Sequence, residues 1–441
     1  MNAEAAWRAV EGRDQRFAGR FFLGVRTTGV FCRPGCPART PRRENVVFFD
    51  TAGAARDAGF RACLRCRPEA AQAPDTGRTL ARALRLLEES GDAAGLADKL
   101  GMTDRHLRRI FSHHLGASPA AVLRTRRLEL ARQLVEGSQA KMIDIAHTAG
   151  FQSLRSFNEA MRRGFGRAPT RLRAAGAADA SFSLRLAFSA PLDFEALLAF
   201  LGKRALPGLE AVADGAWQRT LPEGTLEVRR TGASHLMVRL PAALAPHALP
   251  LAARVRRVFD LRADPDVIEQ HLAQDSRLRP FLRPGLRIPG AWDPFEMAVR
   301  AILGQQISVE RARFLAIQLR EQFGGLTPQA LAGADIRGMP GVRAQAIEQL
   351  ARAVLDGRVR LDGSQPLEQL VAALCELPGI GDWTAQLVAL RGLGEPDAFP
   401  AADLGLCQAM RMTPKDLRQH AERWRPWRGY AAAAIWLAPQ Q

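Results

Sequence analysis

Four of the six cysteines lie within one window of the chain, at the spacing of metal ligands. Three residues separate Cys32 from Cys36, two separate Cys63 from Cys66, and 26 lie between the two pairs. A tetrahedral zinc site requires two such pairs of thiolates, so the pattern predicts one Zn²⁺ ion held by all four sulfurs. For an arbitrary four-cysteine cluster, the alternative is a closed site that only holds a small domain together.

The residues around these cysteines carry a specific resemblance. The segments 25–36 (VRTTGVFCRPGC) and 59–66 (GFRACLRC) closely resemble the amino-terminal domain of Ada-type regulators of the alkylation response, over about residues 5 to 70. The resemblance implies that Cys32 takes a methyl group from a methyl phosphotriester in the DNA backbone, with the other three cysteines as co-ligands. It also implies that four side chains approach that backbone, although any one arginine among them could equally be a solvated surface charge. These are Thr28, Arg39, Arg61 and Arg65.

The chemistry of such a cluster suits methyl transfer without a base or a further cofactor. Zinc keeps a thiol deprotonated at neutral pH, and a thiolate in an all-sulfur shell stays nucleophilic toward an electrophilic methyl carbon. A zinc ion with four thiolates carries a net negative formal charge, so methylation of one sulfur removes a charge that repels phosphate. Methylation is therefore expected to strengthen DNA binding and to act as a switch.

A second set of residues that could do chemistry lies in the carboxy-terminal part of the chain. The segment 377–384 (LPGIGDWT) places Gly379 and Gly381 in a tight turn between helices, where backbone N–H groups can face a phosphate. Alone, this turn could be an inert connection. The segment 301–306 (AILGQQ) precedes it and Asp403 follows it, in the sequence FPAADLGL.

Together these segments resemble the helix-hairpin-helix glycosylases, and most closely the AlkA-type 3-methyladenine DNA glycosylases, over residues 180–440. The resemblance implies that Asp403 stabilises the positive charge that develops on the sugar as the N-glycosidic bond breaks. It also implies that Trp383 and Trp436 line the base pocket, where cationic alkylated purines gain from cation–π attraction. Core packing is the alternative role for any tryptophan.

Other positions refine the activity that this resemblance implies. Enzymes that also cut the strand through a Schiff base carry a lysine where this chain has Trp383, so a monofunctional glycosylase is expected. Gln306 stands where the family wedges a leucine into the duplex, and Leu387 replaces a pocket tyrosine; both departures bear on substrate range and base flipping. A monovalent cation on the hairpin carbonyls is implied as a possible further cofactor. The chain has no Pro-Cys-His-Arg motif, so the glycosylase replaces the O6-alkylguanine methyltransferase half of full-length Ada proteins.

Two helix-turn-helix patterns lie between these parts. In the first, a short apolar-faced helix meets a turn at Gly101, and Thr103 can cap an arginine-rich helix. The arrangement returns 49 residues later with Gly150 and Ser153, and the segment 124–134 is expected to form a connecting helix. One such unit is common in plain helical bundles, but two in tandem in a basic segment favour DNA reading.

Residues 78–173 resemble the AraC-type DNA-binding domain, whose closing motif matches the segment 164–170 (GFGRAPT). The candidate residues that face the DNA groove are Arg105, Arg108, Arg155 and Asn158.

The charge of the chain is concentrated in its front part. Of the net charge of +17, residues 1–174 hold 31 Lys and Arg against 17 Asp and Glu, whereas residues 175–441 hold 31 against 28. The excess of +14 over +3 favours polyanions, with a solvated surface as the alternative.

Composition also bears on location. No stretch reaches the run of about 18 apolar residues that a membrane span requires, and the first 30 residues carry acidic side chains in place of a signal peptide's apolar core. Cys375 and Cys407 stand alone, which argues against a disulfide scaffold and predicts reduced thiols. A cytoplasmic, nucleoid-associated protein without a membrane partner is expected.

The predicted fold is multidomain and mainly α. Linker-like stretches at 70–77 and 173–180 divide the chain. Alternating apolar residues predict strands at 182–188, 225–230 and 235–240 with a helix at 194–201, and the pattern is helical from about Val255 onward. The expected domains are a small α+β zinc domain (1–73), an all-α double helix-turn-helix domain (78–174), a small antiparallel α+β domain (180–250) and an all-α helix-hairpin-helix glycosylase domain (251–441).

These features predict a protein that repairs alkylated DNA and regulates the response to it. It would bind double-stranded DNA at damaged and promoter sites, with RNA polymerase as a further partner. The alternative is a DNA-binding transcription factor whose carboxy-terminal half is a degenerate, binding-only glycosylase fold. Retention of Asp403, Trp383 and the two hairpin glycines argues against that alternative.

Overall fold

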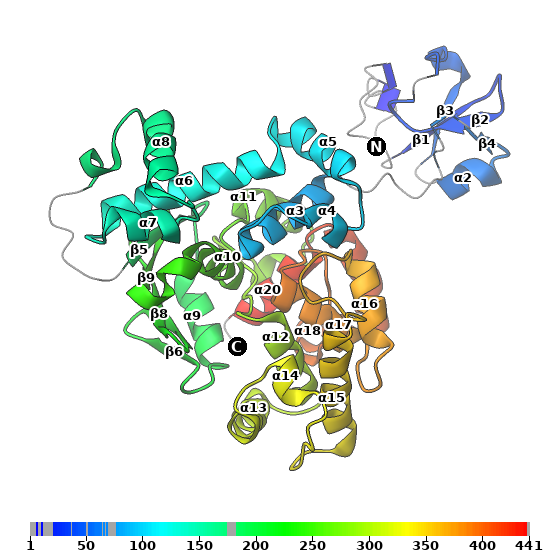
Figure 1. The fold of residues 1–441 in the computed structure, drawn as a ribbon. Helices are drawn as coiled ribbons and strands as arrows, with labels where there is room; N and C mark the ends of the chain where they lie inside the picture. The colour runs from blue at the N-terminus through cyan, green and yellow to red at the C-terminus, as the bar shows by residue number, and fades with distance from the viewer. Residues whose placement is uncertain are drawn as a thin grey trace. The chain divides into compact units, whose positions relative to one another are not determined.

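The computed structural model describes residues 6–7, 10–11, 21–36, 38–49, 52–63, 65–66, 68, 76–173 and 182–438. Contacts divide the chain into two compact units, Met1–Ala81 and Arg82–Gln441 (Figure 1). Most of both predicted linkers, at 70–75 and 174–180, lies outside the described residues. Across the described part of the chain, no helix is both long enough and apolar enough to cross a membrane.

The first unit is built on a four-stranded sheet in the order β3-β1-β2-β4. Its elements are β1 (Phe22–Val25), β2 (Val30–Cys32), η2 (Arg43–Asn45), β3 (Val46–Phe49), α2 (Ala52–Asp57) and β4 (Arg61–Ala62). β1 pairs antiparallel with β2 and β3, whereas β4 runs parallel to β2, with Phe31 opposite Ala62. Because parallel strands end at the same edge, Cys32 and Cys63 come to lie side by side.

The helix-turn-helix segment forms the two predicted units. Its helices are α3 (Thr76–Ser90), α4 (Leu96–Lys99), α5 (Asp104–Leu115), α6 (Pro119–Gly137), α7 (Met142–Thr148), α8 (Leu154–Phe165) and η3 (Pro169–Arg171). The Thr103 hydroxyl accepts from the His106 N–H at 3.3 Å and so caps α5, and Ser153 caps α8 through the Ser156 N–H at 3.2 Å. Both caps and the connecting helix α6 are as predicted.

A five-stranded antiparallel sheet follows, in the order β5-β9-β8-β7-β6. Its elements are β5 (Phe182–Ala187), α9 (Phe194–Gly202), β6 (Glu210–Ala213), β7 (Ala216–Leu221), β8 (Gly224–Arg230) and β9 (His235–Leu240). The three predicted strands and the helix are confirmed, while β6 and β7 were not predicted. The alternate residues Leu184 and Leu186 of β5 are buried, as a sheet with one covered face requires.

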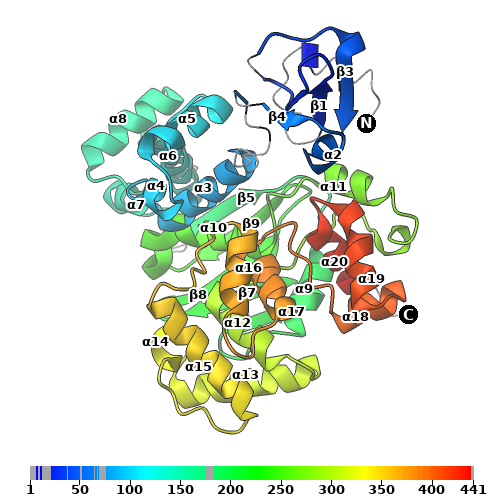
Figure 2. The ribbon, with the colours of Figure 1, turned by 90° about the vertical axis from the view of Figure 1, so that its right-hand side faces the viewer.

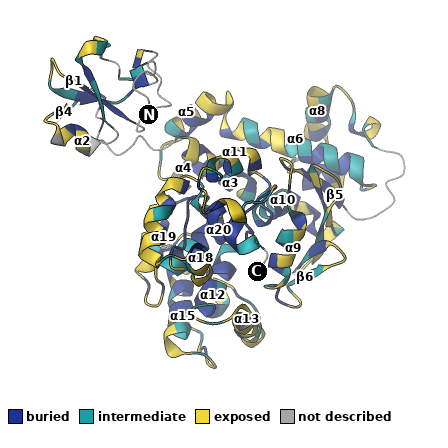
Figure 3. Cartoon of the chain, turned by 180° about the vertical axis from the view of Figure 1, so that it is seen from behind, coloured by how far each residue is buried: buried dark blue, intermediate teal, exposed yellow. Residues whose placement is uncertain are grey.

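The remainder is helical, and the predicted fold class is confirmed. Its elements are η4 (Ala242–His247), α10 (Ala248–Val258), α11 (Pro265–Leu272), η5 (Arg279–Phe281), α12 (Pro294–Leu303), α13 (Val309–Phe323), α14 (Pro328–Leu331), α15 (Gly341–Leu355), α16 (Leu367–Cys375), α17 (Asp382–Leu387), the π-helical turn η6 (Val388–Gly392), α18 (Leu404–Met410), α19 (Pro414–His420), η7 (Ala421–Trp424) and α20 (Arg428–Leu437). Helices α13 to α15 form one group and α18 to α20 another (Figure 2). Helix α20 is buried along most of its length (Figure 3).

The helix-turn-helix segment and the five-stranded sheet share one hydrophobic core. Leu130 and Leu134 of α6 and Phe157 of α8 belong to the same buried cluster as Leu184 of β5. The backbone N–H of Arg185 also donates to the Gln133 side chain at 3.1 Å. The helix-turn-helix segment and the second half of the chain are therefore joined by packing. This explains why both belong to one compact unit, Arg82–Gln441.

A buried group of four charged residues joins the sheet to α12. Arg219 of β7 donates to Glu210 at 2.9 Å and to Glu296 of α12 at 2.8 Å, and Arg300 binds both carboxylates. Each charge thus faces two of opposite sign, which offsets the cost of burying it. The group holds α12 and the sheet together beside a cavity of about 1050 Å³, whose wall includes Arg300.

Glu88 of α3 is the corresponding anchor for the helix-turn-helix segment. Its side chain is only 4% exposed and pairs with Arg126 at 3.4 Å, with Arg256 at 3.8 Å, and with Arg262. Arg126 belongs to α6, whereas Arg256 and Arg262 belong to the second half of the chain. One carboxylate therefore neutralises arginines from both sides of the junction.

We expect Glu88→Ala to lower the free energy of unfolding in urea by about 1 to 3 kcal/mol, because three arginines lose their shared counter-charge. The figure is below that of a fully buried pair, since Arg126 and Arg262 are about half exposed, at 50% and 43%, and water can solvate them. Glu159→Ala is the matched control: its pair with Arg163 is exposed, at 64% and 78%, so a change under about 0.5 kcal/mol is expected. Equal effects of the two substitutions would contradict the assignment.

Candidate functional site

The four predicted zinc ligands lie together in the first unit. Their sulfur atoms are all within 4.8 Å of one another. Cys32 ends β2 and Cys63 follows β4, and the Cys63 N–H donates to the Phe31 carbonyl at 3.0 Å. Gly35, with φ of 76°, adopts the left-handed conformation that turns the chain so that Cys36 comes back to the cluster.

At this separation, negative charges on neighbouring sulfurs repel one another. Hydrogen bonding to Cys66 and burial raise the pKa of the Cys32 thiol, and burial raises the pKa of Cys36. The hydrogen bond with Cys32 lowers the pKa of the Cys66 thiol to about 5. A divalent cation is needed to hold all four as thiolates, and four soft sulfur donors at this spacing fit tetrahedral Zn²⁺. The residues present therefore fit the one zinc ion predicted.

The four residues predicted to approach the DNA backbone are all exposed in this unit: Thr28, Arg39, Arg61 and Arg65. Arg61 and Arg65 flank Cys63 in the sequence, so both lie next to the metal centre. The backbone N–H of Arg61 donates to the Gly29 carbonyl at 2.8 Å, which places the turn that carries Thr28 beside it. Their contacts with DNA stay predictions.

The four candidates in the helix-turn-helix segment are on the two capped helices. Arg105 and Arg108 are exposed on α5 and Arg155 on α8, while Asn158 is partly buried. Arg162, which was not singled out from the sequence, lines the same shallow hollow on α8 as Arg155 and Asn158. The role of each in reading DNA stays a prediction.

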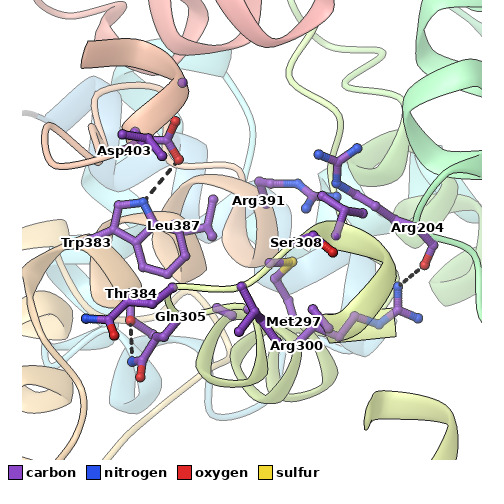
Figure 4. Close-up of a pocket in the computed structure, with 18 of the residues that line it drawn as sticks. Arg204, Met297, Arg300, Gln305, Ser308, Trp383, Thr384, Leu387, Arg391 and Asp403 are labelled. Carbon is purple, nitrogen blue, oxygen red and sulfur yellow. Dashed lines mark hydrogen bonds between the residues drawn. The ribbon is translucent and has the colours of Figure 1, made fainter. Parts of the chain in front are cut away.

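A cavity of about 1050 Å³ lies between α9 of the sheet domain and α12, α13, α17, α18 and α20 (Figure 4). Six of the residues expected at the glycosylase site from the sequence contribute to its wall, from helices α17 and α20 and from the loops that precede α13, α17 and α18. They are Asp403, Trp383, Trp436, Leu387, Gln306 and Gly381. Gly379 does not line the cavity, but its carbonyl accepts a hydrogen bond from the side chain of Gln305, which does.

Both oxygens of Asp403 accept N–H groups. Oδ2 accepts from Trp383 Nε1 at 3.1 Å, and Oδ1 accepts from Trp436 Nε1 at 3.2 Å and from the Leu406 N–H at 3.2 Å. The last bond makes Asp403 the N-cap of α18, where the positive end of the helix favours a carboxylate. The indole N–H groups are thereby satisfied, which leaves the ring faces of both tryptophans for stacking.

The glutamine pair before α13 connects the hairpin with the cavity. Gln305 Nε2 donates to the Gly379 carbonyl at 2.9 Å and to the Thr384 hydroxyl at 3.0 Å, and Arg343 donates to the Gln305 carbonyl. Gln306 is exposed at the cavity rim with φ of 56°, a left-handed conformation uncommon outside glycine. Backbone of this kind persists where the surroundings hold it, and it often marks a functional site. The monovalent cation implied at the hairpin stays a prediction.

Four arginines on the cavity wall were not found from the sequence: Arg204, Arg300, Arg313 and Arg391. Arg204 follows α9, Arg300 is on α12 and Arg391 is in η6. No local pattern distinguishes them from surface arginines, because only the packing of the sheet domain against the helices brings them to one cavity.

Three family matches cover successive parts of the chain. They are the metal binding domain of Ada over residues 5–69, a helix-turn-helix domain over residues 96–175 and the AlkA N-terminal domain over residues 183–293. They correspond to the cysteine cluster, the capped helices and the sheet that supplies one wall of the cavity.

Similar proteins extend these matches. The chain is 39% identical over 474 residues to the probable bifunctional transcriptional activator/DNA repair enzyme AlkA of Mycobacterium tuberculosis (strain CDC 1551 / Oshkosh), covering 98% of this chain and 96% of that protein. It is 38% identical over 268 residues to DNA-3-methyladenine glycosylase 2 of Escherichia coli (strain K12), covering 56% and 94%. It is 37% identical over 160 residues to the bifunctional transcriptional activator/DNA repair enzyme Ada of the same strain, covering 36% and 45%. With a match along nearly the whole length of both chains, this protein belongs to the family of bifunctional transcriptional activator/DNA repair enzymes of the AlkA type.

Proposed function

We propose that this protein repairs alkylated DNA by two separate reactions and uses one of them to regulate transcription. The observation that carries the glycosylase activity is the Asp403 carboxylate, held by two tryptophans on the wall of a cavity of about 1050 Å³. The four-thiol cluster carries the methyl-accepting activity. The two centres belong to different units of the chain.

The glycosylase reaction is hydrolysis of the N-glycosidic bond of an alkylated base such as 3-methyladenine. The base is flipped into the cavity and stacks on Trp383 and Trp436. As the bond between C1′ and the base nitrogen breaks, its electron pair leaves with the base and positive charge develops on the sugar. Asp403 stabilises that charge, water adds at C1′, and an abasic site remains. Trp383 offers no amine for a Schiff base, so the strand stays intact.

The first unit removes a methyl group from a methyl phosphotriester. A bound zinc ion keeps the cluster sulfurs deprotonated at neutral pH. The Cys32 sulfur attacks the methyl carbon, the carbon–oxygen bond breaks, and its electron pair stays on the phosphate oxygen, which restores the ordinary diester. Arg61 and Arg65, exposed beside the cluster, contact the phosphate backbone. The thioether formed is stable, so each chain reacts once.

Methylation of Cys32 then acts as a switch on DNA binding. It removes one negative charge near the phosphates, and the helix-turn-helix segment holds the strengthened complex at promoter sites. Arg105, Arg108, Arg155 and Asn158 read the DNA from α5 and α8. RNA polymerase is the partner that responds to the bound protein, and the nucleoid in the cytoplasm is where it acts.

Asp403→Asn is expected to reduce 3-methyladenine release by about a hundredfold or more, because the substitution keeps the size and removes the charge that faces the sugar. The measurement is single-turnover base release from DNA treated with a methylating agent. Asp264→Asn is the matched control: Asp264 also caps a helix, α11, but lies outside the cavity, so its variant should keep the wild-type rate.

If folded Asp403→Asn protein released the base at close to the wild-type rate, Asp403 would not be the group that stabilises the sugar cation. A wild-type protein that releases no base would favour the binding-only alternative. Wild-type protein should also leave abasic strands uncut until alkali is added. A protein–DNA adduct trapped with borohydride would contradict the monofunctional mechanism.

Cys32 alone among the cluster cysteines should gain a methyl group from methyl phosphotriester DNA, as detected by mass spectrometry of proteolytic peptides. The methylated protein should bind promoter DNA roughly tenfold more tightly at one fixed salt concentration, since one repulsive charge is gone. Cys32→Ser should show neither effect, whereas Cys375→Ser should show both, because Cys375 stands apart from the cluster. Methyl groups on Cys36, Cys63 or Cys66, or unchanged affinity, would rule out the corresponding step.

The purified protein should hold one zinc ion per chain by elemental analysis, and a strong chelator should release it together with four reactive thiols. Before chelation, thiol titration should find only Cys375 and Cys407 reactive, because the cluster sulfurs are bound to the metal. Cys63→Ser should lower the zinc content severalfold, and Cys375→Ser should leave it unchanged. Equal zinc content in these two variants would disprove the four-thiolate site.

A further inference from the structure

Helix α3 is the first helix of the helix-turn-helix segment, yet its polar side chains bind the glycosylase half of the chain. Arg85 donates to the Leu393 carbonyl and, at 3.1 Å, to the Glu395 carboxylate. The side chains of Arg85 and Glu395 are 15% and 16% exposed, so little water competes for this pair. One helical turn further on, Glu89 pairs with Arg257 of α10, whose side chain is 7% exposed. All five residues belong to one compact unit.

The same helix is also bonded to α6. Arg127 of α6 donates to the carbonyl of Gly91, the residue that follows α3, at 2.7 Å. Its neighbour Arg126 pairs with Glu88 at 3.4 Å. Helix α6 in turn shares a hydrophobic cluster with α8. Helix α3 therefore connects the two helix-turn-helix units with the glycosylase half of the chain.

Arg85 binds the segment that follows the π-helical turn η6. The Glu395 N–H donates to the Ala389 carbonyl of η6 at 3.0 Å, which ties this segment to the turn. Arg391, also in η6, lines the cavity (Figure 4). Eight residues after Glu395, the chain reaches Asp403. The two acceptors of Arg85 therefore lie, along the chain, between a cavity arginine and the carboxylate that faces the sugar in the proposed reaction.

Arg257 extends the contact of Glu89 to a second segment of the cavity wall. Its guanidinium donates to the carbonyls of Trp292, at 2.8 Å, and Ala291, at 3.4 Å. Trp292 lies two residues before the start of α12, which contributes to the cavity wall. The Ala291 N–H also donates to the Arg391 carbonyl at 2.8 Å. The two segments that α3 holds are thus bonded to each other.

These bonds fix main chain, because three of the four acceptors of Arg85 and Arg257 in these two segments are backbone carbonyls. Both guanidinium groups are largely buried, where charge-assisted hydrogen bonds are stronger than in water. A misplacement of about 1 Å can lower an enzymatic rate on the order of a hundredfold, even when the substitution lies far from the chemistry. A loosened wall should therefore slow base release while the fold stays intact.

We propose that Arg85 is a positioning residue of the glycosylase: it holds the segment between Arg391 and Asp403 and so keeps the cavity in its active shape. The helix-turn-helix segment thereby has a second role beside DNA reading, as part of the framework of the enzyme. The inference rests on the proposed glycosylase function. The effect of Arg85 passes through Leu393 and Glu395 and requires no contact with DNA.

The test measures 3-methyladenine release from methylated DNA by full-length protein, at several enzyme concentrations that all exceed that of the DNA. Arg85→Met keeps a stem of similar length and should lower the maximal rate about tenfold, with the half-saturating enzyme concentration within about twofold of wild type. Arg85→Lys should recover part of the rate, because an ammonium can still donate to these acceptors. Glu395→Gln should also slow release, and the double variant should be no slower than Arg85→Met, because both substitutions break one interaction.

Glu88→Ala is the matched control. It breaks contacts of the same helix at the same junction, but its partners Arg126, Arg256 and Arg262 do not line the cavity. This variant should therefore be less stable than wild type and yet release the base at the wild-type maximal rate.

A wild-type maximal rate in folded Arg85→Met or in Glu395→Gln protein overturns the inference, and so do equal losses in Arg85→Met and Glu88→Ala. A raised half-saturating concentration with an unchanged maximal rate also overturns it, because that result would show a contact of Arg85 with DNA. Failure of the wild type to release any base overturns the proposed glycosylase function itself.

Discussion

The glycosylase site depends on how the carboxylate of Asp403 is held. A carboxylate beside two tryptophans would be costly to bury without donors, yet three N–H groups reach its two oxygens, from Trp383, Trp436 and Leu406. The same bonds satisfy both indoles and fix their orientation. One small acid therefore organises the negative wall of the cavity, and no base or metal ion is required to keep it in place.

The opposite wall is supplied by a different domain. Phe200 and Arg204 come from the end of α9 in the five-stranded sheet domain, and their distance from Asp403 is set by how that sheet meets α12. The buried group formed by Arg219, Glu296 and their partners joins the sheet to α12 at this junction. The sheet domain is thus part of the cavity, because its residues Phe200 and Arg204 form one of the cavity's walls.

The helix-turn-helix segment is attached to the same body by a shared core and by Glu88, whereas the metal centre belongs to a separate unit. This division suits the proposed activities, because the cysteine cluster reacts once per chain whereas the glycosylase cavity turns over. In the mechanism that we propose, the methyl signal is produced in the first unit and changes the affinity of that unit for DNA through charge. The first unit needs no contact with the glycosylase cavity for this effect, since the first unit and the rest of the chain would bind the same polyanion, DNA.

The sequence by itself determined the features that are local. Two cysteine pairs, with three residues between Cys32 and Cys36 and two between Cys63 and Cys66, indicate a metal site, and Thr103 or Ser153 before an apolar-periodic segment caps the helix that it begins. The motif around Asp403 was found through resemblance, which also led to Trp383 and Trp436. Only the tertiary structure revealed the arginines of the cavity wall, the bond from Gln305 to the hairpin and the arginines around Glu88. The bond from Gln305 to Gly379 spans 74 positions of sequence and the pair of Glu88 with Arg262 spans 174. Over such separations, neither periodicity nor spacing indicates which groups will meet.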